Sequence, residues 1–359
     1  RSMLLEEFRQ RRAAAANWVL DDIRGHVVEF CMDQHGSRFA QDRLDHASRD
    51  QVNWVFEEIR PSARSLMQDV FGNYVVQKMF EYGSTEQRLS LTEEVRNYVV
   101  PLSLSTYGCR VIQKALDYLP DSVRLDLAEE LRGHVLEMVQ DQNANHVVQK
   151  LLSVVENPED VRFISDTFHG RVVSLGAHCY SCRVLQRIFE RCGQAQARPL
   201  LEELHQSSER LMADQYGNYV IQWILQRGMP QDKMKVIEAV VGKVLALSRH
   251  KFASNVVEQV VRAADKSQLR RLASEILEPV GPSPYPYEDE TMASANRAAN
   301  IMMTDQYANY VLQRFIELCE PDQKMKLVSI LQPSLIALRR GAGGPGGWTK
   351  HLAAVERLV

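Results

Sequence analysis

The sequence predicts an all-α solenoid of eight repeats, and three observations support this fold class. A seven-residue string recurs at a nearly fixed period, its apolar residues fall at helical spacing, and a unit of this length cannot bury its own apolar faces. The 359 residues are 45% apolar and 25% charged. This composition suits a globular array with a sizeable core and excludes a disordered or collagen-like chain.

The recurring string is clearest in residues 72–78, 108–114 and 144–150, which read GNYVVQK, GCRVIQK and ANHVVQK. Its second residue, which we call the anchor, defines eight repeats, because five further copies extend the series. The anchors are Ser37, Asn73, Cys109, Asn145, Cys182, Asn218, Ser254 and Asn309. Six of the seven intervals are 36 or 37 residues, and the last, 55 residues, indicates an insertion of about 19. A solenoid is the architecture that such a period predicts.

Each repeat reads as two or three helices. Val75, Val76, Met79 and Phe80 follow the second anchor at helical spacing, and a second helical pattern, as in 87–95, precedes the next anchor. Such helices must stack on neighbouring repeats, so that one helix of each repeat lines the concave side. We expect a single domain over 1–359, with eight repeats over about 31–319 and caps at 1–30 and 320–359.

Two segments interrupt this pattern. Residues 279–297 are rich in proline and acidic residues, which predicts a surface loop, either for partner docking or as a tolerated insertion. The glycine-rich run 341–347 lacks the Lys-Ser/Thr of a phosphate-binding loop and is expected to be a flexible linker. No apolar stretch is long enough for a membrane span, and the start of the chain has no signal-peptide core, which predicts a cytosolic or nuclear location with six free thiols.

Three positions of each repeat, the anchor i with i+1 and i+4, carry a restricted set of side chains that share one helix edge. Position i is Asn, Ser or Cys, position i+1 is Arg or aromatic in seven repeats, and position i+4 is Gln in seven and Glu in one. In chain order the triplets are Ser37/Arg38/Gln41, Asn73/Tyr74/Gln77, Cys109/Arg110/Gln113, Asn145/His146/Gln149, Cys182/Arg183/Gln186, Asn218/Tyr219/Gln222, Ser254/Asn255/Glu258 and Asn309/Tyr310/Gln313.

This triplet suits the binding of unpaired bases. Flat side chains stack on nucleobases, with about 1–3 kcal/mol per base, and amides or hydroxyls beside them can read the Watson–Crick edge. Over positions i to i+5 of the eight repeats the net charge is +6, although the whole chain carries −3. The sequence therefore predicts a locally basic surface for an anionic partner.

The eight ordered motifs, together with the opening Leu4-Leu5-Glu6-Glu7-Phe8-Arg9, resemble the Pumilio (PUF) family over nearly the whole chain. The resemblance implies a right-handed solenoid of eight three-helix repeats with atypical caps, in which each repeat reads one base of single-stranded RNA. It also implies no catalysis and no cofactor or metal. The sequence departs from the family pattern at Ala144 and Ser181, where glycine is usual, and in the glycine-rich segment before Trp348.

The family's code assigns uracil to Asn with Gln, adenine to Ser or Cys with Gln, and guanine to Ser with Glu. A carboxylate such as Glu258 suits the N1–H and N2–H donors of guanine. The amide of Gln can rotate to suit uracil or adenine, so discrimination between these two bases must come partly from the anchor. With RNA antiparallel to the protein, the implied target is 5′-UGUAUAUA-3′, in 3′ untranslated regions. The resemblance further implies a cytoplasmic monomer that recruits deadenylation and translational-repression proteins.

Two other interpretations are open. A peptide-binding solenoid of the armadillo or HEAT kind also uses ladders of Asn, but the pairing of Glu258 with Ser254 and the regular Arg/aromatic positions favour RNA. Cys179 and Cys182 form a C-x-x-C that is typical of zinc or redox sites. Against that, Cys182 is an anchor like Cys109, and no second ligand pair lies at finger spacing.

Overall fold

A computed structural model of the protein describes residues 2–10, 18–279, 297–341 and 350–359. These residues are predominantly α-helical and form no β-strand, and an isolated β-bridge joins Pro279 to Arg297. No helix in these ranges has the length and apolar character needed to cross a lipid bilayer. The predicted loop at 279–297, apart from its two end residues, and the predicted linker at 341–347, apart from Gly341, lie outside the described residues.

Three helices make up each repeat: a short one, the motif helix that carries the triplet, and a third helix. The short helices are α2 (Val27–Cys31), α5 (Ala63–Gln68), α8 (Val99–Leu104), α11 (Val135–Gln140), α14 (Val172–Gly176), α17 (Ser208–Met212), α20 (Val244–Ser248) and α24 (Ala298–Thr304). The motif helices are α3 (Gln34–Leu44), α6 (Gly72–Tyr82), α9 (Gly108–Tyr118), α12 (Ala144–Val154), α15 (Ser181–Arg191), α18 (Gly217–Arg227), α21 (Ala253–Ala263) and α25 (Ala308–Leu318).

The third helices differ more in length. They are α4 (Arg49–Ile59), α7 (Thr85–Val95), α10 (Asp121–Glu129), α13 (Arg162–Asp166), α16 (Gln194–Gln206), α19 (Pro230–Val240), α22 (Lys266–Leu277) and α26 (Pro321–Gly341). Before the first repeat lie α1 (Met3–Gln10) and a 3₁₀ turn at Leu20–Ile23, and after the last lies α27 (Lys350–Leu358).

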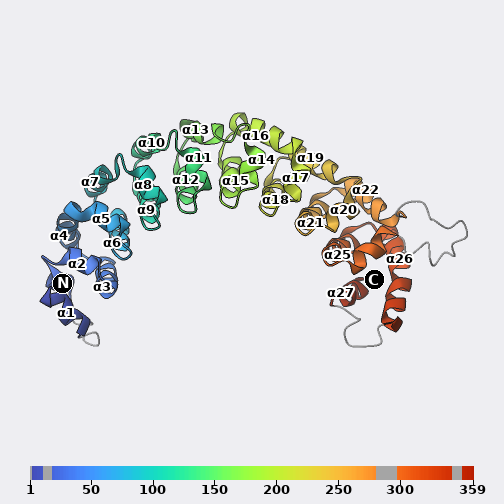
Figure 1. Ribbon diagram of the computed structural model, residues 1–359, viewed down its shortest axis with the longest axis horizontal. Helices are drawn as coiled ribbons and strands as arrows, with labels where there is room; N and C mark the ends of the chain where they lie inside the picture. Colours follow the sequence, from blue (N-terminus) through green and yellow to red (C-terminus); the bar gives the residue numbers. More distant parts are fainter. Residues whose placement is uncertain (1, 11–17, 280–296, 342–349) are drawn as a thin grey trace, which may run out of the picture. The chain divides into compact units, whose positions relative to one another are not determined.

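The chain divides into two compact units, residues 1–169 with 179–197 and residues 170–178 with 198–359. In the first unit the motif helices α3, α6, α9, α12 and α15 pack in sequence order and follow one edge, while α4, α7, α10 and α13 follow the other (Figure 1). In the second unit α18, α21, α25 and α27 make the corresponding row. Each unit therefore places the triplets of its repeats on consecutive, touching helices.

The apolar stripe of each motif helix forms the core. In α6 the side chains of Val75, Val76, Met79 and Phe80 are fully buried, as the helical spacing predicts. Gly72 begins this helix against α5, and a Cβ at this position would lie 2.8 Å from Leu66 Cδ2. Burial of side chains of this size contributes roughly 1.5–3 kcal/mol each, so packing between repeats, not helix propensity, holds the motif helices in place.

In four of the repeats, a glutamate in or next to the third helix accepts hydrogen bonds from the start of the short helix of the same repeat. In the third repeat, for example, the Glu130 carboxylate accepts from the backbone N–H groups of Asn97, at 2.8 Å, and Val99, at 3.2 Å, and so caps α8. Asn97 itself has a φ of 63°. The other capping residues are Glu58, Glu203 and Glu275, and each bonds to a glycine of positive φ and to the residue two positions on. These bonds fix the short helix relative to the third.

Both ends of the repeat rows are covered. Phe8 of α1 lies against Trp18, Phe30 and Phe39, with ring centroids 5.1 to 5.2 Å apart. At the other end α27 packs on α25, and the His351 ring meets the Tyr310 ring edge-on at 5.7 Å. Terminal helices thus shield the apolar faces that the first and last repeats would otherwise expose.

Candidate nucleic-acid interface

Most motif helices begin at a carboxylate four residues before the anchor. In the second repeat, Asp69 Oδ1 accepts from the backbone N–H groups of Phe71, at 2.9 Å, and Gly72, at 2.7 Å. The same cap recurs at Asp33, Asp141, Asp214 and Asp305. Burial raises the pKa of Asp305, but the two N–H groups and Arg249 outweigh burial and hold that pKa below its usual value. Sequence reasoning missed these caps, although Asp recurs at position i−4 in five repeats.

The anchor asparagines are buried, and they support the glutamine one turn further on. Asn73 is 1% exposed, and its Nδ2 donates to the carbonyls of Asp69, at 2.8 Å, and Val70, at 3.2 Å. Its Oδ1 then accepts from Gln77 Nε2 at 2.9 Å. Asn73 therefore holds Gln77 through its Oδ1, and both hydrogens of its Nδ2 are already donated to backbone carbonyls, so that neither is available to a ligand. The same bond, at 2.8 to 3.1 Å, joins Gln149 to Asn145, Gln222 to Asn218 and Gln313 to Asn309.

The anchors Ser37, Cys109 and Cys182 hold their Gln differently. Their short side chains donate to the backbone carbonyl three residues earlier, at 3.4 to 3.7 Å. The Gln donates instead to the backbone carbonyl of the anchor itself, at 3.0 to 3.1 Å, and these donors are Gln41, Gln113 and Gln186. The same Gln amide is thus held by a side chain in four repeats and by the backbone in three.

The amide at position i+4 is therefore less free than the sequence predicts. Free rotation of this amide was expected, but in all seven repeats Nε2 donates one hydrogen bond to a group of its own helix. The seven residues, all half-buried, are Gln41, Gln77, Gln113, Gln149, Gln186, Gln222 and Gln313. The physical reason is that Nε2 can reach the anchor one turn earlier. Since an amide nitrogen carries two hydrogens, one N–H and Oε1 of each Gln have no hydrogen-bond partner among the described residues and can meet a ligand.

The seventh repeat carries a carboxylate where the others have an amide. Glu258 Oε1 accepts from Arg262 Nη2 at 3.0 Å and from Arg314 Nη2 at 3.1 Å. Arg314 comes from the motif helix of the eighth repeat. Glu258 Oε2 makes no hydrogen bond within the described part of the chain. Two guanidinium groups therefore orient this side chain, and the sequence triplet did not include either of them.

Position i+1 projects away from the core. Tyr74, Tyr219 and Tyr310 are 50%, 58% and 52% exposed. The other exposed residues of this series are Arg38, Arg110, Arg183 and the exception Asn255. In most repeats this position presents a flat surface that can stack against a planar ligand.

His146 is the half-buried member of this series. Burial lowers its pKa, and the positive charges of Arg110 and Arg183 lower it further. A pKa below the usual value keeps the ring neutral at neutral pH. In this repeat the flat surface at position i+1 is therefore an uncharged imidazole.

The predicted local charge of +6 overstates the free positive charge. Lys78, Lys114 and Lys150 pair with Asp45, Glu81 and Asp117, each located eight positions after the preceding anchor and so outside the counted window. Arg187 and Arg314 pair with Glu190 and Glu317 on their own helices. The remaining positive charge lies at Arg38, Arg110 and Arg183, which make no ion pair within the described residues.

Within the C-x-x-C pair, Cys182 has the same environment as the anchor Cys109 of the third repeat. Cys182 is 2% exposed and its Sγ donates to the carbonyl of Cys179 at 3.7 Å, as Cys109 does to Thr106 at 3.4 Å. Cys179 and Cys182 are free thiols. No group of three or more His, Cys, Asp or Glu residues in the described ranges is arranged to hold a metal ion.

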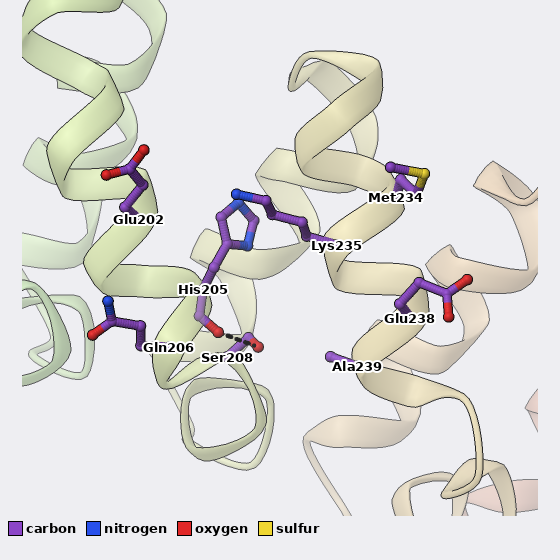
Figure 2. A pocket seen from close by; sticks show the side chains of 8 residues that line it. All are labelled: Glu202, His205, Gln206, Ser208, Met234, Lys235, Glu238 and Ala239. Carbon is purple, nitrogen blue, oxygen red and sulfur yellow. Dashed lines mark hydrogen bonds between the residues drawn. The ribbon is translucent and has the colours of Figure 1, made fainter.

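A surface pocket of about 590 Å³ lies away from the triplets, between α16 and α19 (Figure 2). His205 and Lys235 contribute to its lining, and no triplet residue does. His205 Nε2 lies 2.9 Å from Asp232, which is 1% exposed and also accepts from Arg198 Nη2 at 2.6 Å. Burial raises the pKa of Asp232, but these two partners outweigh burial and lower it. The cluster joins two third helices and is structural.

The comparisons with known proteins agree with this geometry. The Pumilio-family RNA binding repeat matches the chain eight times, at residues 26–60, 63–96, 98–132, 134–166, 171–205, 210–241, 243–277 and 301–331. The chain belongs to the Pumilio (PUF) family. The predicted all-α solenoid of eight three-helix repeats is confirmed, and the family matches include α2 in the first repeat and residues 321–331 of α26 in the eighth.

Solved Pumilio domains resemble the whole chain. The Puf3 RNA binding domain bound to a recognition site of the Cox17 RNA 3′ UTR is 39% identical, with 99% of each chain covered and a TM-score of 0.87. PUF-8 in complex with PBE-RNA is 32% identical, with 99% of each chain covered and a TM-score of 0.85. Both of these structures contain RNA, which supports the prediction that this Pumilio chain is an RNA-binding solenoid.

Curated relatives match shorter segments. Pumilio homolog 4 of Arabidopsis thaliana is 41% identical over 163 residues, which are 45% of this chain and 14% of the relative. A Pumilio domain-containing protein of Schizosaccharomyces pombe is 31% identical over 181 residues, which are 50% of this chain and 24% of the relative. The matched segments thus span about a quarter or less of these Pumilio proteins.

Proposed function

We propose that this chain binds single-stranded RNA with one base per repeat and prefers 5′-UGUAUAUA-3′. The observation that carries the proposal is the correspondence between anchor type and hydrogen bonding. All four repeats assigned to uracil hold their Gln through an Asn side chain, all three assigned to adenine hold it through the backbone, and the one assigned to guanine has a carboxylate.

The difference matters because Gln carries both a donor and an acceptor and can pair with either edge. Uracil offers N3–H between two carbonyl oxygens, whereas adenine offers an amino group beside the acceptor N1. A Gln displaced toward an Asn side chain and a Gln held on the backbone meet the base at different positions along its edge. The location of the Gln amide along the base edge, and not the residue type at i+4, therefore separates uracil from adenine.

Guanine recognition has a simpler basis. Its N1–H and N2–H groups are both donors, and a carboxylate is an acceptor at both oxygens. The arginines that hold Glu258 at Oε1 leave Oε2 without a protein partner among the described residues. A guanine edge can then add to a carboxylate that is already oriented, at little cost in side-chain entropy.

Exposed position i+1 supports binding of an unpaired strand. Tyr219, Asn255 and Tyr310 lie on α18, α21 and α25, three motif helices that pack side by side in this order. A base can enter between such side chains only if it is unpaired. The expected ligand is therefore single-stranded RNA. Because a solved relative is bound to a 3′ UTR sequence, we extend the proposal to messenger RNA. We extend it further to cytoplasmic repression by a monomer that recruits deadenylase or translational-repressor proteins.

Fluorescence anisotropy tests the proposal. Labelled 5′-UGUAUAUA-3′ and the variant 5′-ACAAUAUA-3′ are titrated with the protein at several salt concentrations. We expect the first RNA to bind about 100-fold more tightly or better, since each mismatched base costs about 1–3 kcal/mol where hydrogen bonds read its edge. Equal affinity for the two RNAs would overturn sequence-specific binding.

A further inference from the structure

A ladder of ion pairs runs beside the triplets of the first four repeats. Its three steps join a carboxylate at position i+8 of one repeat to a lysine at position i+5 of the next. Lys78 pairs with Asp45, Lys114 with Glu81 at 3.0 Å, and Lys150 with Asp117 at 3.0 Å. We call these six residues the acid–lysine ladder. Since every step spans two repeats, the ladder follows the row of motif helices α3, α6, α9 and α12.

The ladder adjoins the surface proposed to bind RNA. In a helix, residues four apart are neighbours, so position i+5 lies one turn beyond the stacking position i+1, and position i+8 lies one turn beyond the Gln at i+4. In α9, for example, Arg110 and Lys114 lie one turn apart, as do Gln113 and Asp117. A strand whose bases contact positions i, i+1 and i+4 brings its phosphates close to these lysines.

The lysines of the ladder are half-buried and can be reached from solvent. Their side chains are 23% to 30% exposed, and those of the paired carboxylates are 28% to 40% exposed. Ion pairs with this exposure contribute little to stability, because water and salt screen them. A phosphate group offers the same kind of acceptor oxygen as the carboxylate and can take its place at the ammonium group.

From this arrangement we infer that Asp45, Glu81 and Asp117 set the affinity for RNA by competing with its phosphates for Lys78, Lys114 and Lys150. The inference rests on the proposed function. Without RNA the three carboxylates neutralise the three lysines, which limits non-specific attraction of other polyanions. When RNA binds, each lysine moves from carboxylate to phosphate, and the released carboxylate attracts a solvent cation.

This exchange has a characteristic salt dependence. A lysine that neutralises a phosphate normally releases a counterion and adds about 0.7 to the slope of log K against log[salt] for single strands. In the ladder that release is offset, because the freed carboxylate takes up a cation. Removal of the carboxylates therefore steepens the slope by up to about 2 for three lysines.

The test compares two triple variants in anisotropy titrations with 5′-UGUAUAUA-3′ between about 50 and 300 mM salt. Asp45→Asn/Glu81→Gln/Asp117→Asn removes the ladder carboxylates. Glu93→Gln/Asp126→Asn/Glu129→Gln removes the same charge from α7 and α10, where Arg96 and Arg132 are the partners. We expect the ladder variant to bind about tenfold more tightly at about 100 mM salt with a steeper slope, and the control to differ little from the wild type.

A ladder variant with wild-type affinity and slope, or a control that gains as much, overturns the inference. Adding Lys78→Ala/Lys114→Ala/Lys150→Ala to the ladder variant gives a second measurement without unpaired carboxylates: lysines that bind phosphate predict that the gain in affinity and slope is lost, whereas lysines that do not contact the RNA predict that it is kept. Thermal melts by circular dichroism check that all variants are folded. If the wild type does not separate 5′-UGUAUAUA-3′ from 5′-ACAAUAUA-3′, the proposed function fails; if it does and the ladder variant is unchanged, only the ladder fails.

Discussion

Repeats with an Asn anchor and repeats with a Ser or Cys anchor contain the same Gln but support it with different groups. In the fourth repeat Gln149 donates to the Asn145 side chain at 2.9 Å, while in the third Gln113 donates to the backbone carbonyl of Cys109 at 3.0 Å. The amide offered to a ligand is chemically identical in both. The difference teaches that a buried anchor decides which group holds the more exposed Gln, and under the proposed function this support sets the base preference.

The seventh repeat extends this comparison to a third type of support. Glu258 is held by arginines, one from its own helix and one from the next repeat. In each type the side chain at i+4 is oriented before a ligand arrives. Under the proposed function, base specificity therefore depends on the supporting group as much as on the group that contacts the base.

The largest expected effect comes from converting the carboxylate repeat into a repeat whose Gln is held by an Asn anchor. Ser254→Asn with Glu258→Gln replaces the carboxylate by an Asn-held amide, and we expect the preferred second base to change from G to U. Each matched edge contributes about 1–3 kcal/mol, so the preference should invert. Anisotropy with 5′-UGUAUAUA-3′ and 5′-UUUAUAUA-3′ measures it. A variant that still prefers G disproves the assignment of this repeat.

A stacking residue should behave differently from an anchor. Tyr219→Ala removes an exposed ring, and we expect it to weaken binding by about 1–3 kcal/mol whichever base stands at the third position. The same anisotropy titration is run with all four bases at that position. Tyr219→Phe keeps the ring and is expected to bind as the wild type does. A loss restricted to one base would show that Tyr219 reads an edge.

A single change at an anchor isolates the supporting group. Asn145→Ser leaves Gln149 in place but removes its side-chain acceptor, so the amide is expected to bind the backbone carbonyl as in the third repeat. We expect the preference at the fifth base to move from U toward A by about 1 kcal/mol. Competition between 5′-UGUAUAUA-3′ and 5′-UGUAAAUA-3′ measures the shift. The reciprocal change, Ser37→Asn, is tested with 5′-UGUAUAUA-3′ and 5′-UGUAUAUU-3′ and is expected to move the preference at the last base from A toward U. An unchanged preference in both would mean that the supporting group is irrelevant.

The smallest expected effect concerns the arginine that reaches Glu258 from the neighbouring helix. Arg314→Ala leaves Arg262 in place, and we expect discrimination for G at the second base to fall by about 0.5–1 kcal/mol, with other bases unaffected. Arg187→Ala removes the arginine at the same position of the fifth repeat, which pairs with Glu190 on its own helix, and serves as control. Equal losses in both variants would point to general electrostatics instead of orientation.

The substitutions at Ala144 and Ser181 show how robust the anchor geometry is. Both residues are buried at the start of their helices, at the position before the anchor, where four of the other six repeats have glycine. Even so, Asn145 Nδ2 donates to the carbonyl of Asp141 at 2.8 Å, the same distance as in the second and sixth repeats. Gln186 likewise keeps its bond to the Cys182 carbonyl, at 3.1 Å. The departure from the family pattern leaves both triplets intact.

Much of this protein follows from the sequence alone. The period of the anchors determined the number of repeats, and the apolar spacing in residues such as Val75 and Met79 determined the buried face. The polar triplet at i, i+1 and i+4 predicted a ligand surface, and this remains a prediction. These properties are local and repeated, so that each copy strengthens the inference from the others.

Only the tertiary structure decided how each triplet is supported and how its charge is balanced. The bond from Gln149 to Asn145 depends on side-chain rotamers, and the bonds that Glu258 and Lys114 make to neighbouring repeats depend on how the helices pack. A count of charges over one helix cannot include a carboxylate on the next. The physical reason is that hydrogen bonds and ion pairs act over a few ångströms in space, whatever the distance along the chain.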